Sequence, residues 1–161
     1  MSRVPRASAR GGREERDMNK RVLVVEDELD MRIFLSTLLE TGGYHALVSR
    51  NGREGFSLAK ASRPDLVILD VMMPDEGGAV MYRMLKADED LSSIPVLMLS
   101  AVPEKSFRHY LAMMNIRPEN ALPSPDVYIQ KPPDADELLA AIRRLLAEAG
   151  SQNGPAASHK P

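Results

Sequence analysis

The chain has 161 residues, of which 43% are hydrophobic and 27% are charged, and its formal net charge is −2 at pH 7. This balance suits one globular domain with its own core, and the small net charge does not favour a nucleic-acid partner. The absence of cysteine excludes disulfides, thiol nucleophiles and cysteine-ligated zinc, and the three histidines show no metal-ligand spacing. No apolar run approaches the roughly 18 residues of a membrane span, and no secretory signal precedes the domain, so we expect a cytoplasmic protein without a membrane partner.

Two polar ends enclose the part of the chain that can form a core. Residues 1–17 are rich in arginine and poor in large apolar side chains, so we expect a disordered basic extension there. Because Met18 directly precedes "NKRVLVVEDE", where structured sequence begins, these residues also fit an upstream addition outside the natural product. Residues 150–161 are small and polar, and we expect a disordered tail. The predicted domain covers residues 18–149.

Five short apolar runs alternate with helical patterns along this domain. The runs have the length and composition of strands and cover residues 21–26, 44–49, 65–70, 94–100 and 127–130. The first helical pattern ends at Gly42-Gly43, and its apolar residues repeat at spacings of three and four: Met31, Phe34, Leu35, Leu38 and Leu39. Residues 51–62, 78–88 and 104–115 are predicted to form the next three helices.

The last helix has both a start signal and an apolar stripe. Asp134 precedes Glu137 by three residues, which is a capping-box arrangement with Asp134 as the cap. The stripe consists of Leu138, Ile142, Leu145 and Leu146 and ends before Gly150. The alternation of strand and helix predicts an α/β fold, a doubly wound five-stranded parallel sheet with helices on both faces.

In such a sheet, ligands bind beyond the carboxyl ends of the strands. The first strand ends at Glu26-Asp27, the third at Asp70 and the fourth at Ser100, and the fifth leads into Lys131. Clustered carboxylates repel one another unless a cation joins them, and their hard oxygen atoms suit Mg²⁺. A carboxylate can also attack phosphorus to give an aspartyl phosphate, with the metal, a lysine and a hydroxyl neutralising the phosphoryl oxygens. Asp70 is therefore the candidate nucleophile.

Four fragments in this order resemble the receiver domain of bacterial response regulators: "VVEDE" (24–28), "LVILDVMMP" (66–74), "LMLSA" (97–101) and "YIQKP" (128–132). The resemblance covers residues 21 to about 148 and implies the flavodoxin-like strand order 2-1-3-4-5. It also implies that Asp70 is the phosphoacceptor and that Mg²⁺ is held by Asp27 and Asp70, by Glu26 through water and by the backbone carbonyl of Met72. Ser100 and Lys131 would contact the phosphoryl group, and Tyr128 would change rotamer when Ser100 moves.

By this resemblance the protein is a phosphorylated switch in a two-component system, with only self-phosphorylation and self-dephosphorylation chemistry, and not an enzyme. The phosphodonor would be a sensor histidine kinase or a histidine phosphotransfer protein. Because only 12 residues follow Ala149, we expect a single-domain regulator that signals through a changed protein-binding surface to a downstream protein. Phosphorylation-dependent homodimers are left open.

The same residues disfavour two rival functions. A phosphorylation-independent receiver-fold interaction module is disfavoured by the complete set of acids, Ser100 and Lys131. A Mg²⁺-dependent aspartyl-phosphate phosphohydrolase of the haloacid-dehalogenase kind needs a second acid two residues after the nucleophile, where this chain has Met72. No cofactor-binding motif is present, since both G-x-G-x-x-G and the P-loop pattern are missing.

The chain departs from the family pattern in two places. Glu26 replaces the more frequent Asp, which keeps the charge. The segment of residues 101–126 is longer than the roughly 16 to 24 residues that one helix and two ordinary loops need, and it contains Pro118, Pro123 and Pro125. We expect most of its helical apolar residues to pack on the sheet, and we favour partner binding over an inert spacer for its proline-rich part. Those apolar residues are Phe107, Tyr110, Leu111 and Met114.

Overall fold

The computed structural model describes residues 18–73, 77–115, 117, 119 and 121–152. Its strands are β1 (Arg21–Val25), β2 (His45–Ser49), β3 (Leu66–Leu69), β4 (Val96–Ser100) and β5 (Val127–Gln130). Its helices are α2 (Leu29–Thr41), α3 (Gly52–Ser62), α4 (Gly78–Ala87), α5 (Glu104–Met114) and α6 (Ala135–Gln152). The predicted extension at residues 1–17 and the tail from residue 153 onward lie outside the described residues.

The five strands form one parallel sheet in the order β2-β1-β3-β4-β5, so the predicted fold class and strand order are confirmed. The strands begin and end within two residues of the predicted positions. The central strand β3 is a continuous run of four buried aliphatic residues, as expected for a parallel strand that is covered on both faces. Among the described residues, no helix combines the length and the apolar composition that crossing a membrane requires.

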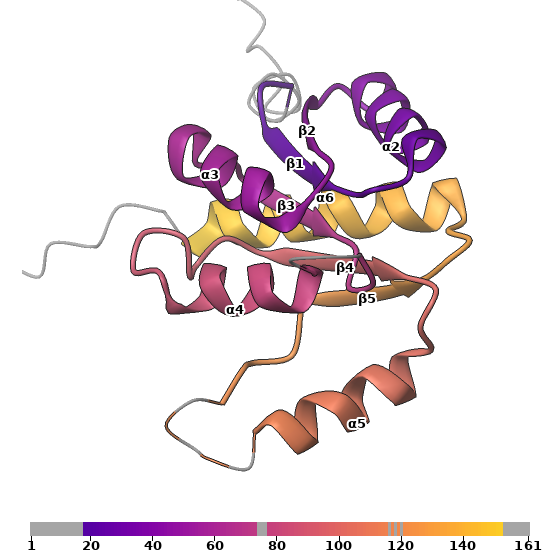
Figure 1. Ribbon diagram of the computed structural model, residues 1–161. Coiled ribbons are helices and arrows are strands. Elements are labelled where there is room, and N and C mark those ends of the chain that lie inside the picture. The colour runs from indigo at the N-terminus through magenta and orange to yellow at the C-terminus, as the bar shows by residue number, and fades with distance from the viewer. Residues whose placement is uncertain (1–17, 74–76, 116, 118, 120, 153–161) are drawn as a thin grey trace, which may run out of the picture.

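The two faces of the sheet are covered by different helices, as Figure 1 shows. Helices α2 and α6 pack on the face that carries Val22 and Val24, with Leu35 and Leu39 buried there. The predicted stripe of α6 is buried on this face: Leu138, Ile142, Leu145 and Leu146. Helices α3, α4 and α5 cover the opposite face, which carries Leu23 and Val25.

The start signal of α6 is confirmed, because the Glu137 backbone N–H donates to Oδ1 of Asp134 at 2.9 Å. The predicted end of this helix is too early, since α6 continues through Gln152, three residues past Ala149. The predicted boundary lies before Gly150 because glycine often ends a helix, but a glycine inside a helix costs only about 1 kcal/mol and is tolerated here.

Two aromatic residues that share the helical spacing of the apolar side chains are exposed. Phe34 of α2 is 37% exposed and Tyr110 of α5 is 43% exposed. Phe107 and Leu111 are buried as predicted. The side chain of Met114 lies outside the described residues.

The long segment after α5 is fastened to the domain by side chains. Asn115 makes two hydrogen bonds to the backbone of Leu122, its Nδ2 donating to the carbonyl at 2.9 Å and its Oδ1 accepting from the N–H at 2.7 Å. The hydroxyl of the buried Tyr82 in α4 donates to the carbonyl of Pro123 at 2.7 Å. The described part of this segment is therefore held against α4 and α5, while Pro118 lies outside the described residues.

Candidate functional site

The carboxyl ends of the strands bring the predicted acids and the predicted lysine together. Nζ of Lys131 lies 2.7 Å from Oε2 of Glu26 and 3.0 Å from Oδ2 of Asp70, and it lies 3.8 Å from Oε1 of Glu28. Glu26 and Asp70 are buried, and only 11% of the Lys131 side chain is exposed. The ammonium group is therefore the cation that allows two buried carboxylates to lie side by side.

Three carboxylates of this site could hold a metal ion. Glu26, Asp27 and Asp70 each offer one oxygen atom, and these atoms lie within 4.8 Å of one another. Asp27 is only partly buried, so the cluster is open to solvent on its side. A set of hard oxygen donors at the surface end of a parallel sheet fits Mg²⁺, which keeps several of its own ligand positions for water and phosphate.

Burial and hydrogen bonding act in opposite directions on the pKa values of Glu26 and Lys131. Burial raises the pKa of Glu26 to about 7, and the Asp70 charge adds to this rise, while hydrogen bonds from Lys131 and from the Glu28 N–H oppose it. Burial alone would lower the pKa of Lys131, but its hydrogen bonds to Glu26 and Asp70 outweigh burial, so its pKa is raised. Lys131 therefore remains a cation at neutral pH.

Backbone contacts fix the loops that carry these acids. The Met72 N–H donates to Oδ1 of Asp70 at 3.0 Å, which leaves Oδ2 to Lys131. Nη1 of Arg32 in α2 donates to the carbonyls of Glu26 and Asp27 at 2.9 and 2.7 Å. Sequence reasoning missed Arg32, because no motif marks a side chain that binds backbone carbonyls five and six residues earlier.

Gly78 is a second residue that the sequence did not single out. A Cβ atom at this position would lie 1.8 Å from the carbonyl oxygen of Asp70, which is far inside van der Waals contact. Any side chain at position 78 would therefore displace either the first turn of α4 or the end of β3. The Gly77-Gly78 pair in the printed sequence was the available signal for this close approach.

Ser100 and Tyr128 lie on neighbouring strands and are connected through Val102. The Ser100 side chain is completely buried, and its Oγ accepts from the Val102 N–H at 3.2 Å. The Tyr128 hydroxyl donates to the Val102 carbonyl at 2.5 Å. The ring of Tyr128 stacks on Phe107 of α5 with centroids 5.2 Å apart. A displacement of the loop after Ser100 would therefore reach Tyr128 and α5 directly.

Residues 22–143 match the response regulator receiver domain. The chain belongs to this family. The structure holds the predicted site residues at the carboxyl ends of the strands: Glu26, Asp27, Asp70, Ser100 and Lys131.

Curated relatives of this receiver domain include the polar-differentiation response regulator DivK of Brucella anthropi. That protein is 34% identical over 133 residues, which is 82% of this chain and 100% of the relative. DivK of Brucella ovis is 33% identical over the same share of both chains. The similarity thus covers the entire length of these regulators.

Solved structures agree with this assignment. A receiver domain of a signal transduction histidine kinase from Syntrophus aciditrophicus is 32% identical, covers 86% of this chain and 97% of its own, and superposes with a TM-score of 0.68. A Vibrio cholerae chemotaxis protein is 24% identical, covers 78% of this chain and 98% of its own, and has a TM-score of 0.67. The second likeness shows the shared fold alone. The sequence-based identification of the family is thus confirmed, whereas the individual roles of the site residues stay predictions.

Proposed function

We propose that this receiver domain accepts a phosphoryl group on Asp70 from a histidine kinase or a histidine phosphotransfer protein and signals through a changed protein-binding surface. The observation that supports it most strongly is the position of the Lys131 ammonium, 3.0 Å from Oδ2 of Asp70 at the open edge of the sheet. In this proposal the protein is a cytoplasmic phosphoacceptor switch and not an enzyme that turns over a separate substrate.

The transfer step uses the carboxylate of Asp70 as the nucleophile. One of its oxygen atoms forms a bond to the phosphorus of a phosphohistidine, the bond between phosphorus and imidazole nitrogen breaks, and the imidazole leaves with that electron pair. Lys131 would compensate negative charge on the phosphoryl oxygens, and the Ser100 hydroxyl would donate a hydrogen bond to one of them. Ser100 now accepts from the Val102 N–H, so its hydroxyl proton can be redirected without breaking that bond.

Mg²⁺ bound by Glu26, Asp27 and Asp70, with the Met72 carbonyl as a further ligand, would supply positive charge for the phosphoryl oxygens. Asp27 is the most exposed of the three acids and has no ion pair among the described residues, so its carboxylate is the one most available to a cation. The role of this chain's own residues is to hold three carboxylates close together before the ion arrives.

The surface beside the site offers a contact for the phosphodonor. Leu29 and Ile33 lie on α2, which begins directly after the acid pair, and they are 60% and 55% exposed. Two exposed aliphatic side chains one turn apart, next to the phosphoacceptor, suit an apolar surface on the histidine-bearing protein. The same acids and Lys131 disfavour an interaction module that works without phosphorylation, because such a module gains nothing from a buried cluster of charges.

Intact mass spectrometry after incubation with acetyl phosphate tests the phosphoacceptor. We expect a mass gain of one phosphoryl group that requires Mg²⁺ and is absent in Asp70→Asn, while Asp30→Asn, which alters an exposed acid of α2, keeps the gain. A gain that persists in Asp70→Asn would refute the site.

Amide NMR titration with Mg²⁺ tests the metal ligands: Asp27→Ala should weaken Mg²⁺ binding at least fivefold, and Asp30→Ala should leave it unchanged. Equal affinity in both variants would contradict the role of Asp27.

A further inference from the structure

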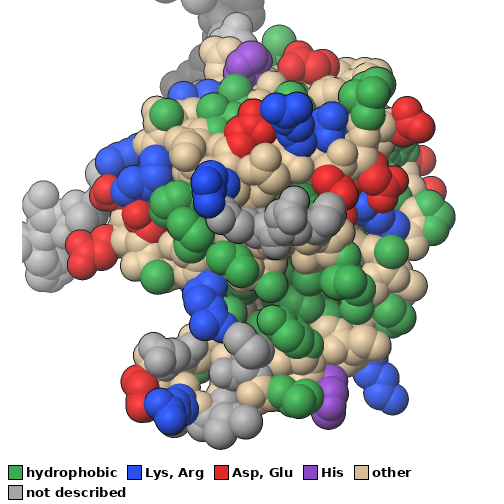
Figure 2. All heavy atoms as spheres, viewed as in Figure 1, with side chains coloured by type: hydrophobic (Ala, Val, Ile, Leu, Met, Phe, Trp, Pro, Cys, Tyr) green, Lys and Arg blue, Asp and Glu red, His purple; other side chains and the backbone are tan. Residues whose placement is uncertain are grey.

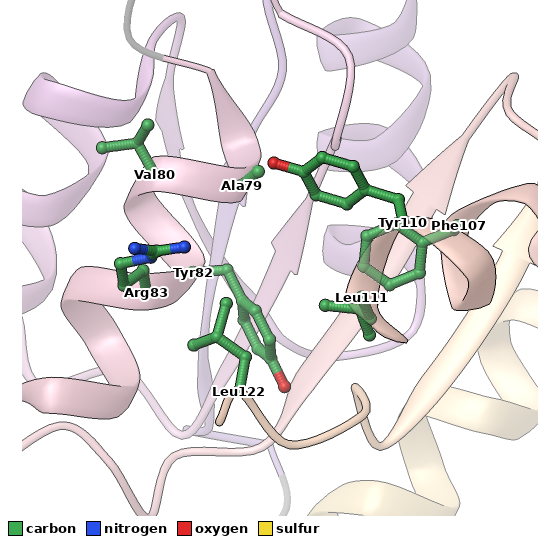
Figure 3. Close-up of a pocket in the computed structure, with 8 residues that line it drawn as sticks. All are labelled: Ala79, Val80, Tyr82, Arg83, Phe107, Tyr110, Leu111 and Leu122. Carbon is green, nitrogen blue, oxygen red and sulfur yellow. The ribbon is translucent and has the colours of Figure 1, made fainter. Parts of the chain in front are cut away.

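A pocket of about 330 Å³ lies between α4 and α5, on the face of the sheet that these helices cover. Figure 3 shows Phe107 and Tyr110 of α5 on one side and Tyr82 of α4 on the other, with Leu122 beside the Tyr82 ring. Its walls come from three parts of the chain: Tyr82 and Arg83 of α4, Phe107, Tyr110 and Leu111 of α5, and Leu122 of the long segment. Its volume is at the lower end of what ligand pockets offer, which suits one or two side chains of a partner.

The long segment forms part of this pocket because side chains hold it there. Asn115 binds both backbone groups of Leu122, and the Tyr82 hydroxyl binds the carbonyl of Pro123. These three hydrogen bonds keep the Leu122 side chain against the pocket and lower the conformational entropy that a binding partner would have to remove. The pocket is thus a built feature of the fold that depends on the extra length between β4 and β5.

Apolar side chains extend from the pocket onto the surrounding surface. Val80 and Met84 of α4 are 51% and 40% exposed, and Tyr110 and Met113 of α5 are 43% and 61% exposed. Figure 2 shows hydrophobic side chains gathered over the space between these helices, where the surface is hollowed. An apolar surface that continues beyond a small pocket is larger than a small molecule of that volume would cover, and this favours a protein segment as the occupant.

The positive charge of Arg83 at the pocket indicates the charge of the partner. Arg83 is exposed, and within the described part of the chain it makes no ion pair. Among the other cations of these helices, Lys86 donates to two backbone carbonyls and Arg108 pairs with Glu104, while Lys105 does not line the pocket. The Arg83 guanidinium has no carboxylate partner among the described residues and lies beside an apolar pocket. It is therefore complementary to a ligand that carries an acidic group next to an apolar group.

The pocket also shares a wall with the switch residues. Phe107 lines the pocket on one side and stacks on Tyr128 on the other, and the Tyr128 hydroxyl is bonded to the loop that follows Ser100. A new position of Tyr128 would remove the nearer of the two rings that stack on Phe107, the other being Tyr110, and so change the pocket. Binding in the pocket and phosphorylation of Asp70 would thereby be linked, and linkage of this kind acts in both directions.

We propose that the groove between α4 and α5 binds an acidic segment of a partner protein, which inserts an apolar side chain into the pocket and places a carboxylate against Arg83. This inference rests on the proposed function, since the partner would be the downstream target of the switch. A second copy of the chain fits less well, because a two-fold contact brings the same patch of both copies together and with it two Arg83 side chains of like charge.

Amide NMR titration of the ¹⁵N-labelled full chain with three blocked peptides tests this inference. The probes are acetyl-Glu-Glu-Leu-Phe-Glu-Glu-amide, the same peptide with Gln in place of each Glu, and the same peptide with Ser in place of Leu and Phe. We expect saturable shifts in α4 and α5 with the acidic apolar peptide, at least threefold weaker binding of the Gln peptide, and no saturable binding of the Ser peptide. Equal affinity for the acidic and Gln peptides, or shifts confined to other elements, would overturn the inference.

Two variants and two states complete the test. Arg83→Gln should reduce the affinity for the acidic peptide to that of the Gln peptide. Arg143→Gln, on α6 across the sheet, should leave the affinity unchanged. If Arg83→Gln binds the acidic peptide as tightly as the parent does, the inference is also overturned. After incubation with acetyl phosphate and Mg²⁺, the affinity for the acidic peptide should change at least threefold. Equal affinity of the phosphorylated and unphosphorylated protein would overturn the linkage between the pocket and Asp70. The mass gain at Asp70 is measured on the same samples. This measurement distinguishes a protein that is not phosphorylated from a groove that does not bind the peptide.

Discussion

Lys131 and Asp70 are 61 positions apart in the chain, yet Nζ of Lys131 lies 3.0 Å from Oδ2 of Asp70. The same ammonium lies 2.7 Å from Oε2 of Glu26, so one cation serves two carboxylates that are buried from solvent. Removing one partner from such a group leaves buried charge without compensation, which costs more than the intact arrangement contributes. The site is therefore a place where function and folding stability depend on the same side chain.

Replacing Lys131 by Met should lower the free energy of unfolding by about 3 kcal/mol, because the buried carboxylates lose their cation while the aliphatic part of the side chain is kept. Urea unfolding measures the loss, and millimolar Mg²⁺ should restore part of it. Lys60→Met is the matched control, because Lys60 pairs with Asp88 at the surface and solvent screens that pair, so its effect should be much smaller. Equal urea midpoints for the parent and Lys131→Met would contradict the account.

The lifetime of the phosphorylated state should depend on Met72, whose side chain is 64% exposed two residues after Asp70. A thioether cannot position water for attack on the acyl phosphate, so slow decay is expected in the parent. Met72→Asn should shorten the half-life several-fold in a mass-spectrometric time course, and so should Val102→Glu. Met113→Asn, on the similarly exposed Met113 of α5, should leave decay unchanged. Decay that is unchanged or slower in Met72→Asn would count against this role.

Much of the site could be predicted because parallel sheets place all strand carboxyl ends on one edge. Once the apolar runs are read as parallel strands, Glu26, Asp70 and Lys131 must lie at the same edge of the sheet, whatever the helices do. The strands themselves are predictable because a run such as Leu66–Leu69 has no polar face that could point to solvent. These inferences depend on periodicity and topology and not on particular side-chain contacts.

The contacts that the sequence did not reveal are those between a side chain and a distant backbone group. Tyr82 binds the carbonyl of Pro123, and Arg32 binds the carbonyls of Glu26 and Asp27, but every residue has a carbonyl and none marks a partner. The exposure of Phe34 and Tyr110 could not be predicted for another reason. Helical spacing shows which residues share a face but not how wide a strip of that face the sheet covers.

Lys86 should make folding stability depend on pH in the alkaline range. Burial lowers the pKa of its ammonium, and the Asp126 charge only partly opposes this. The unfolded chain therefore binds more protons as pH approaches the usual lysine value of 10.5, and stability rises with pH in that window. Relative to Lys86→Met, the parent should gain stability between pH 8 and about pH 10.5 in urea unfolding. A difference between the two proteins that stays constant or shrinks would show that Lys86 is not desolvated.

Asn115 should control both the order of the long segment and the pocket that this segment completes. Its side chain makes two hydrogen bonds to the backbone of Leu122, and Leu122 lines the pocket between α4 and α5. Asn115→Ala removes both bonds, so the Leu122 amide should exchange with solvent at least tenfold faster, and the acidic apolar peptide should bind at least threefold more weakly.

The control for this variant is Asn51→Ala, which removes the cap of α3, where Oδ1 of Asn51 accepts from the Glu54 N–H at 2.8 Å. Each substitution should cost about 1 kcal/mol of folding stability, since each removes a local anchor of the backbone. Only Asn115→Ala should alter hydrogen exchange at Leu122 and peptide affinity. If Asn51→Ala alters both to the same extent, the effect reflects general destabilisation, and Asn115 does not position the wall of the pocket.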